Sequence, residues 1–259
     1  MLTHLLEGEA GCAFARARGA VAVVVDALRA SATAAALLEA GATAVLAVRE
    51  VGEALAVKAA WPDALLYGER GGLPPAGFDH GNSPAEAPAA RGRRVIFTTT
   101  TGAGRMVQCR GARTALMGGP MNASAVCRAA ATLAGKDGEV AIISAGLMDE
   151  PGYDAQEDRA AAVFLAGRLL GTPGLGAVLG EGRDMHETYT PLLESRGLER
   201  LFADAPHAEN LRRIGRESDI ALCAQVDVFS AAPMAVEDLP QGVLLTAFGL
   251  GMETTGGNG

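Results

Sequence analysis

Residues 20–42 read AVAVVVDALRASATAAALLEAGA, and they are the clearest evidence on the fold. The first six of these residues are continuously apolar, as expected for a parallel strand that is buried on both faces of a sheet. The apolar run ends at Asp26, and the alanine-rich segment from Ala30 to Ala40 predicts a helix that stops at Gly41. Asp26 and Arg29 are therefore expected at the carboxyl end of a strand, which is where open α/β proteins bind ligands.

Strand-like and helix-like segments alternate on both sides of this unit. Strands are predicted at residues 43–48, 64–68, 95–97, 113–119 and 139–145, and in the later segments 220–229 and 241–249. Helical patterns separate most of them, and residues 171–217 predict two or three amphipathic helices. This alternation predicts an α/β protein with three layers, α/β/α, around a mostly parallel sheet.

The chain shows no linker and no break in composition, so we expect a single domain over residues 1–259. The βα units on either side of Val140 resemble each other, which suggests two fused subdomains that divide near residues 135–140. Of the 259 residues, 49% are hydrophobic, which is ample for a packed core.

The charge and the cysteines limit the classes of function. The net charge is −8 and the pI is near 5.1, whereas proteins that bind nucleic acids normally carry a basic excess, so we expect no nucleic-acid partner. We find no secretory signal and no apolar stretch of about 18 residues, which predicts a cytoplasmic protein without a membrane partner. The four cysteines lack CxxC spacing and predict buried thiols. The sequence is compatible with a homo-oligomer.

Residues 68–84 read GERGGLPPAGFDHGNSP and form the second informative stretch. Seventeen residues without helical or strand periodicity are long for a connection inside a compact domain, and such loops are usually functional or disordered. The glycines allow sharp turns and a close approach to a ligand. Glu69, Arg70, Asp79 and Asn82 offer a metal ligand, an anion clamp and hydrogen-bonding groups. We interpret the stretch as an active-site loop; a surface turn with solvated charges is the alternative.

Other segments carry polar groups close to predicted strand ends. Thr98 to Thr101 follow a strand, and their hydroxyls, together with the free amides of the next helix, form a ready anion site. Glu157 and Asp158 fall in the first turn of a helix that ends near Leu170. They either interact with the helix dipole or take part in the chemistry, and both readings stay open. His186 and His207 read as ordinary surface histidines.

Several well-known catalytic motifs are missing from the sequence. It contains no GxxxxGK[ST] phosphate loop, no GxSxG elbow and no HExxH zinc motif. Asp26 follows a strand, as in phosphatases that attack with aspartate, but Leu28 stands where those enzymes usually carry a second aspartate. This favours Asp26 as a metal ligand over Asp26 as a nucleophile.

Five motifs together resemble the 2-phosphosulfolactate phosphatases, in the same order and at similar spacing: DALRAS (26–31), GERGG (68–72), GFDHGNSP (77–84), TTTTG (98–102) and GGPMNASAV (118–126). QEDRAA (156–161) and DIALCAQVDVFSAAP (219–233) extend the likeness over nearly the whole chain. The resemblance implies a Mg²⁺-dependent phosphatase that acts on a small phosphorylated, sulfonated or carboxylated hydroxy acid. Its reaction would convert 2-phosphosulfolactate into sulfolactate and phosphate, on a route that in methanogens leads to coenzyme M.

The residue types suit this chemistry, because a phosphate monoester dianion repels attacking water and must be neutralised and positioned. We predict Mg²⁺ ligation by Asp26, Glu69 and Asp79. Arg29 and Arg70 are the expected forked donors to anionic groups. We predict that Asp26, Glu69 and Arg70 are catalytic, and that substrate is bound by Arg29, Gly71, Asn82, Thr98, Thr99, Thr100, Thr101 and Asn122.

The sequence also departs from the family pattern. Thr101 and Ala103 replace the asparagine and the last threonine of TTTNGT, and Ala161 stands where a cysteine is expected. A Ser-x-His-Gly-Arg stretch survives only in part, around His207. Two interpretations remain: a Mg²⁺ phosphatase that acts on a small-molecule phosphate ester, and a catalytically silent homologue that binds small anions. The surviving carboxylates favour the first, and the missing asparagine favours the second.

Overall fold

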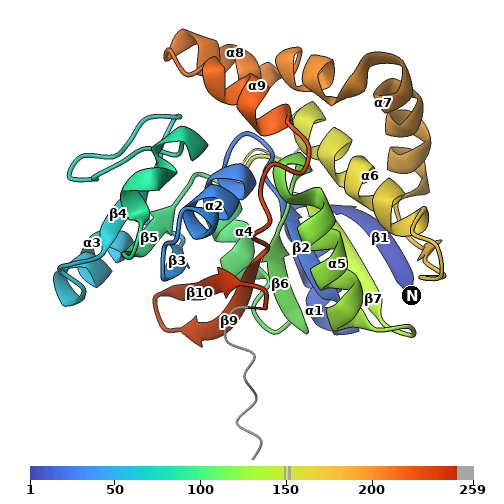
Figure 1. Ribbon diagram of the computed structural model, residues 1–259, viewed down its shortest axis with the longest axis horizontal. Helices are drawn as coiled ribbons and strands as arrows, with labels where there is room; N and C mark the ends of the chain where they lie inside the picture. Colours follow the sequence, from blue (N-terminus) through green and yellow to red (C-terminus); the bar gives the residue numbers. More distant parts are fainter. Residues whose placement is uncertain (149, 151–152, 250–259) are drawn as a thin grey trace, which may run out of the picture.

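The computed structural model describes residues 1–148, 150 and 153–249 (Figure 1). Its centre is a ten-stranded sheet with the strand order β4-β5-β3-β10-β9-β6-β2-β7-β1-β8. Of the nine pairings between neighbouring strands in this part of the chain, six are parallel. The strands are β1 (Leu2–Glu7), β2 (Val21–Val25), β3 (Ala44–Val48), β4 (Leu65–Gly68), β5 (Arg94–Thr98), β6 (Thr114–Met117), β7 (Glu139–Ser144), β8 (Val178–Leu179), β9 (Pro233–Leu239) and β10 (Gly242–Ala247).

Helices cover both faces of the sheet, so the predicted α/β fold with a mostly parallel sheet is confirmed. Apolar contacts place α1, α2 and α4 on one face and α3, α5 and α6 on the other, while α7 packs on α6. The helices are α1 (Gly8–Arg18), α2 (Ala30–Glu39), α3 (Val51–Ala60), α4 (Gly102–Gln108), α5 (Ala123–Ala134), α6 (Gln156–Leu170), α7 (Arg183–Ala203), α8 (Pro206–Arg213) and α9 (Ser218–Ala224), with 3₁₀ turns η1 (Pro84–Ala90) and η2 (Pro120–Asn122).

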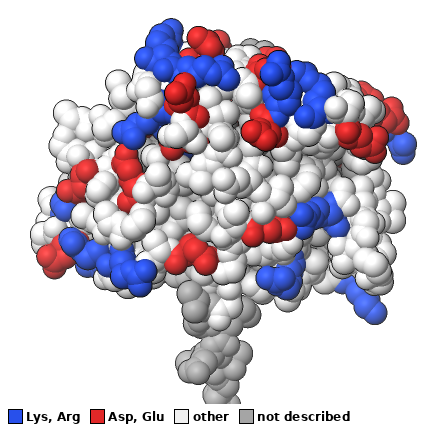
Figure 2. Space-filling view, turned by 45° about the horizontal axis from the view of Figure 1, so that its top comes forward, with Lys and Arg blue, Asp and Glu red and all other residues white. Residues whose placement is uncertain are grey.

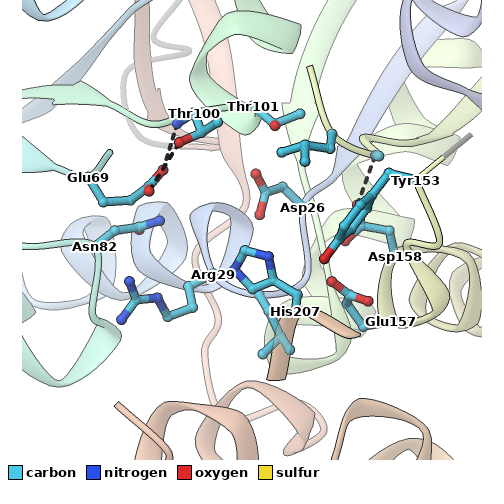
Figure 3. Close-up of a pocket in the computed structure, with 13 residues that line it drawn as sticks. Asp26, Arg29, Glu69, Asn82, Thr100, Thr101, Tyr153, Glu157, Asp158 and His207 are labelled. Atoms are coloured by element: carbon cyan, nitrogen blue, oxygen red, sulfur yellow. Dashed lines mark hydrogen bonds between the residues drawn. The ribbon is translucent and has the colours of Figure 1, made fainter. Parts of the chain in front are cut away.

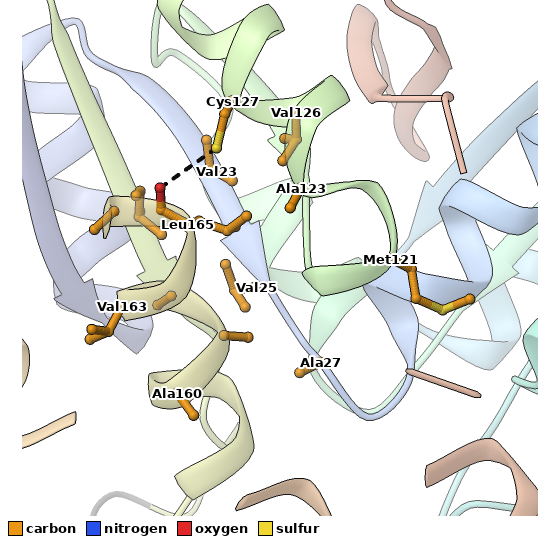
Figure 4. Close-up of a cluster of buried hydrophobic side chains, with 14 of the residues drawn as sticks. Val23, Val25, Ala27, Met121, Ala123, Val126, Cys127, Ala160, Val163 and Leu165 are labelled. Carbon is orange, nitrogen blue, oxygen red and sulfur yellow. Dashed lines mark hydrogen bonds between the residues drawn. The ribbon is translucent and has the colours of Figure 1, made fainter. Parts of the chain in front are cut away.

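Strand β2 is central and fully buried, as the apolar run predicts. Its alternate side chains serve the two faces: Val23 and Val25 pack with Val126 of α5 and Leu165 of α6 (Figure 4), and Val24 belongs to the opposite core. The residue that follows β2, Asp26, is therefore fixed by close packing on both sides of the sheet.

The strand predicted at residues 220–229 is wrong. Residues 218–224 form α9, whose buried Ile220, Cys223 and Ala224 recur at the i, i+3, i+4 spacing of a helix. A short apolar run does not distinguish the two periods, and the strand begins only at Pro233. Strand β1, which the sequence did not reveal, pairs with β7.

Strands β9 and β10 form an antiparallel hairpin inside the sheet, where β10 pairs with β3 and β9 with β6. Strand β7 pairs with both β1 and β2, so residues on either side of 135–140 share one sheet. The likeness between the two halves stays a prediction. No helix in the described ranges is long and apolar enough to cross a membrane. On the face drawn in Figure 2, basic and acidic side chains are interspersed rather than gathered by sign.

Candidate functional site

A small cavity lies at the carboxyl ends of β2, β4, β5 and β7, as expected for an open α/β sheet (Figure 3). Its volume is about 30 Å³. The lining combines carboxylates, one arginine, one histidine and uncharged polar groups: Asp26, Arg29, Glu69, Asn82, Thr100, Thr101, Tyr153, Glu157, Asp158 and His207, with Leu28, Gly146 and Leu147.

Asp26 lies at the centre of this group (Figure 3). Its Oδ1 accepts a hydrogen bond from the Ala30 N–H at 3.2 Å, which fixes the carboxylate at the start of α2. A Cβ atom at Gly102 would lie 2.7 Å from Asp26 Oδ2, so only glycine lets α4 begin this close. Burial raises the pKa of Asp26 to about 6, and the nearby charge of Glu69 adds to the rise.

Glu157 and Asp158, at the start of α6, face the same cavity (Figure 3). Asp158 accepts backbone hydrogen bonds from Ala27 at 2.8 Å and Gly146 at 3.0 Å, so it joins the ends of β2 and β7. Glu157 is buried, and its Oε2 has no hydrogen-bond partner within the described residues. Burial raises the pKa of Glu157 to about 8, and it also raises that of Asp158. Of the two readings left open, this placement favours the functional one.

These raised pKa values predict a pH-dependent stability when divalent cations are removed. Between about pH 4 and pH 8 the folded protein binds more protons at Asp26 and Glu157 than the unfolded chain does, so stability falls as pH rises. We expect the Tm in EDTA to decrease from pH 5 to pH 8, and the decrease to be smaller in Asp26→Asn/Glu157→Gln. Thermal unfolding followed by circular dichroism measures both slopes. Exposed Glu199→Gln is the control, and equal slopes in all three proteins would contradict the prediction.

Glu69 joins the loop after β4 to the threonine turn after β5. Its Oε2 accepts hydrogen bonds from the Gly72 N–H at 2.8 Å and the Thr100 hydroxyl at 3.1 Å, while Oε1 accepts the Thr100 N–H at 2.6 Å. Glu69 and Asp26 therefore meet at one cavity, as predicted from their positions after strands. Three donors already occupy the two carboxylate oxygens of Glu69, so this side chain is better placed to brace the loop than to bind a metal ion. Glu157 Oε2, which has no partner within the described residues, is better placed to bind one.

Arg29 is the buried cation of the site, with a relative exposure of 2%. Its Nη1 donates to Asp219 Oδ2 at 2.7 Å and its Nη2 donates to the Gly72 carbonyl at 2.9 Å. Asp219, from α9, also accepts a hydrogen bond from the Ser83 hydroxyl at 2.7 Å. The guanidinium is thus held from two sides at the cavity wall. Asn82 lies beside it, and its Oδ1 has no partner within the described residues (Figure 3).

Comparison with known proteins shows the family of this chain. The family model described as 2-phosphosulpholactate phosphatase matches residues 12–238, which include every residue of the cavity. The chain belongs to this family.

Several relatives of this chain are named probable 2-phosphosulfolactate phosphatases. The protein from Deinococcus radiodurans is 39% identical over 234 residues, which cover 86% of this chain and 92% of the relative. The protein from Thermus thermophilus is 38% identical over 83% of this chain and 87% of its own length. The protein from Pseudothermotoga lettingae is 34% identical over 84% and 90%. By its family, the chain is a phosphoric monoester hydrolase.

Two charged loop residues, Arg70 and Asp79, do not line the small cavity, although we predicted that Arg70 is catalytic and that Asp79 binds the metal ion. Arg70 donates to the Glu69 carbonyl at 2.7 Å, the Arg49 carbonyl at 2.7 Å and the Thr98 hydroxyl at 3.0 Å, so it braces the strand ends. Asp79 accepts the Leu66 N–H at 2.8 Å and does not join Asp26 and Glu69. The structure therefore corrects the expected placement of both: Arg70 follows Glu69 directly but is drawn to carbonyl groups away from the cavity.

Most of the remaining predicted substrate-binding residues have structural partners. The Thr98 hydroxyl donates to the Arg49 carbonyl at 3.1 Å, and the Thr99 hydroxyl accepts the Ala103 N–H at 3.0 Å. Asn122 bonds backbone groups of Gly119, Met117 and Ala231. Gly71 has φ 60° and turns the loop so that Gly72 meets Glu69. None of these four lines the cavity, whereas Thr100 and Thr101 do.

His207 and Tyr153 also line the small cavity, although the sequence did not assign either to the site. The expectation that His207 is an ordinary surface residue is wrong: α8 places its ring at the cavity, and burial lowers its pKa. The surviving histidine of the partial Ser-x-His-Gly-Arg stretch was the signal for this position. Tyr153 carried no comparable signal.

Proposed function

We propose that the protein is a Mg²⁺-dependent phosphatase that hydrolyses the phosphate ester of a small sulfonated or carboxylated hydroxy acid, with 2-phosphosulfolactate as its first candidate substrate. The observation that carries this proposal is that the half-buried carboxylate of Asp26, the buried carboxylate of Glu157 and the buried guanidinium of Arg29 line one cavity. The family match and the names of the relatives support the ester chemistry.

The residues present fit a magnesium ion. Asp26 and Glu157 offer carboxylate oxygens, and Glu157 Oε2 is a buried acceptor without a partner in the described part of the chain. Among the described residues, no three His, Cys, Asp or Glu side chains form a ready-made metal site. A Mg²⁺ ion at this cavity would therefore take one or two carboxylates and complete its shell with waters and substrate phosphate.

We assign Asp26 and Glu157 as the residues that would hold the ion. Asp158 fixes the backbone after β2 and after β7, because it accepts the N–H groups of Ala27 and Gly146. When bound, Mg²⁺ would neutralise charge on the phosphoryl oxygens. Arg29 has donors beyond the two that bond Asp219 and Gly72, and these can bind the same oxygens. The Thr101 hydroxyl accepts the Met148 N–H at 3.2 Å, which leaves its proton available for an oxyanion.

The proposal is tested by phosphate release from 2-phosphosulfolactate, 2-phospholactate and phosphoglycolate. The protein is first treated with EDTA and is then assayed with and without added Mg²⁺. We expect hydrolysis only with Mg²⁺, and the highest kcat/KM for the sulfonated ester. Equal rates in EDTA would contradict the metal requirement. Absence of hydrolysis for every ester would favour the silent anion-binding homologue, the interpretation that the threonine at position 101 supports.

A further inference from the structure

A second and larger cavity adjoins the candidate active site. Its volume is about 610 Å³, within the range of small-molecule sites, and it shares Gly146, Leu147 and Tyr153 with the small cavity. It lies beside the ends of β1 and β7 and the first turn of α1, so it is also at the carboxyl edge of the sheet.

The two cavities can share a substrate between them. The small cavity has a volume of about 30 Å³ and the larger one about 610 Å³, so the bulk of a phosphorylated hydroxy acid has more room in the larger cavity. The larger cavity can take the rest of such a molecule while the phosphoryl group meets Arg29 and Asp26. Gly146, Leu147 and Tyr153 line both cavities, so a substrate that occupies both would lie against these three residues.

Arg105 is the cation at this boundary. It lies one helical turn after Thr101 in α4, and its relative exposure is 6%. Its Nε donates to the Ala145 carbonyl at 3.0 Å, directly before the shared Gly146, and its Nη1 donates to Gln108 Oε1 at 2.7 Å. None of the hydrogen bonds among the described residues uses its Nη2. Within the described part of the chain, one edge of this buried guanidinium is therefore free of protein hydrogen bonds.

The position of Gly8 shows where this edge points. A Cβ atom on Gly8 would lie 3.3 Å from Arg105 Nη2, which places the nitrogen against the first turn of α1. No side chain caps that turn. The free N–H groups of an 11-residue helix and the guanidinium therefore present positive charge to the same part of the cavity.

The described acidic residues that line this cavity do not cancel that charge. Glu7 is paired with Arg159 at 2.6 Å, and Glu9 and Glu150 are exposed to solvent, where charges are screened. Two further guanidiniums belong to the lining: Arg159, and the half-exposed Arg49, which is paired with Glu50 at 3.3 Å. Among the described residues that line the cavity, Arg105 is the buried charge.

We propose that the larger cavity binds the sulfonate or carboxylate of the substrate, and that Arg105 is the residue that recognises it. This inference rests on the proposed function and adds a division of labour: Arg29 binds the phosphoryl end, and Arg105 binds the acid end. It predicts that the enzyme prefers phosphate esters that carry a second anionic group over esters of the same size that lack one.

The test uses two esters that differ only in that group, 2-phospholactate and isopropyl phosphate. In Arg105→Met we expect kcat/KM for 2-phospholactate to fall by about 10- to 100-fold, the typical loss of a charged hydrogen bond, with little change for isopropyl phosphate. Arg183→Met, which removes an exposed positive charge, is the control and should leave both values unchanged. A selectivity ratio equal to that of the wild type, or an equal loss for both esters, would overturn the inference.

Arg105 also braces Ala145, so a folding defect must be separated from a binding defect. Arg105→Lys keeps the positive charge but loses the fork, and it should show an intermediate selectivity ratio if the methionine variant does not fold. Calorimetric titration with sulfolactate provides a readout that needs no catalysis. If the wild type hydrolyses no ester but binds sulfolactate through Arg105, the proposed function fails and the acid site stands. If sulfolactate binds equally to the wild type and Arg105→Lys, the acid site fails.

Discussion

Arg29→Met is expected to lower the free energy of unfolding by about 3–5 kcal/mol, because it leaves Asp219 as an unpaired charge in the interior. Both side chains of this ion pair have an exposure of 2%, and their atoms are 2.7 Å apart. Of the three hydrogen bonds that connect Ser83, Asp219, Arg29 and Gly72, only the one from Ser83 would remain. The same variant should lose phosphate release, since Arg29 is our proposed donor to the phosphoryl oxygens.

A double variant separates the two effects. Replacing a buried ion pair by apolar residues of similar volume is often neutral for stability, so Arg29→Met/Asp219→Leu should regain most of the lost free energy of unfolding. It should not regain activity. Urea unfolding and phosphate release are measured on the same preparations, with Arg183→Met as a control expected to change stability by less than about 0.5 kcal/mol. A double variant as unstable as Arg29→Met would show that the pair is not the cause, and an active one would remove Arg29 from the mechanism.

Asp26→Asn is expected to lower Mg²⁺-dependent turnover by about 10²- to 10³-fold or more, the usual loss when a group that stabilises transition-state charge is removed. Its stability should be equal to that of the wild type or higher, because the amide is neutral and the carboxylate is costly to bury. Loss of activity without loss of stability is the pattern of a site residue that is held in place by the fold.

Asp79→Asn is the matched control for this prediction. The same chemical change is made at a carboxylate that lies outside the cavity and accepts the Leu66 N–H. Turnover and the Mg²⁺ concentration for half-maximal activity should each change by less than about twofold, as expected for a residue that touches no reacting group. An effect of Asp79→Asn as large as that of Asp26→Asn would restore Asp79 to the metal site and contradict the placement described here.

The sequence predicted the parts of the site that depend on strand ends. Asp26, Glu69 and Thr100 follow β2, β4 and β5, and parallel strands bring such residues to one edge. It could not predict which way a side chain turns within an irregular loop. Glu69 and Arg70 are neighbours, but one faces the cavity and the other bonds backbone carbonyls beside the Thr98 hydroxyl.

Residues from distant segments were harder to predict for a different reason. His207 and Asp219 belong to α8 and α9, and only tertiary packing brings these helices over the ends of the strands. The pattern of a helix indicates its buried face but not the partner of that face. The run at residues 220–229 predicts a strand because a short apolar run fits both the strand and the helix period. The order of the sequence gives no indication that the β9–β10 hairpin lies between β3 and β6.

The β9–β10 hairpin also sets the order in which the active site can be built during synthesis. In the described sheet, the group β4-β5-β3 pairs with the group β6-β2-β7-β1-β8 only through this hairpin. Glu69 follows a strand of the first group and Asp26 follows a strand of the second. Both groups leave the ribosome before residues 233–247, so we expect them to join into one continuous sheet only after the hairpin has been synthesised.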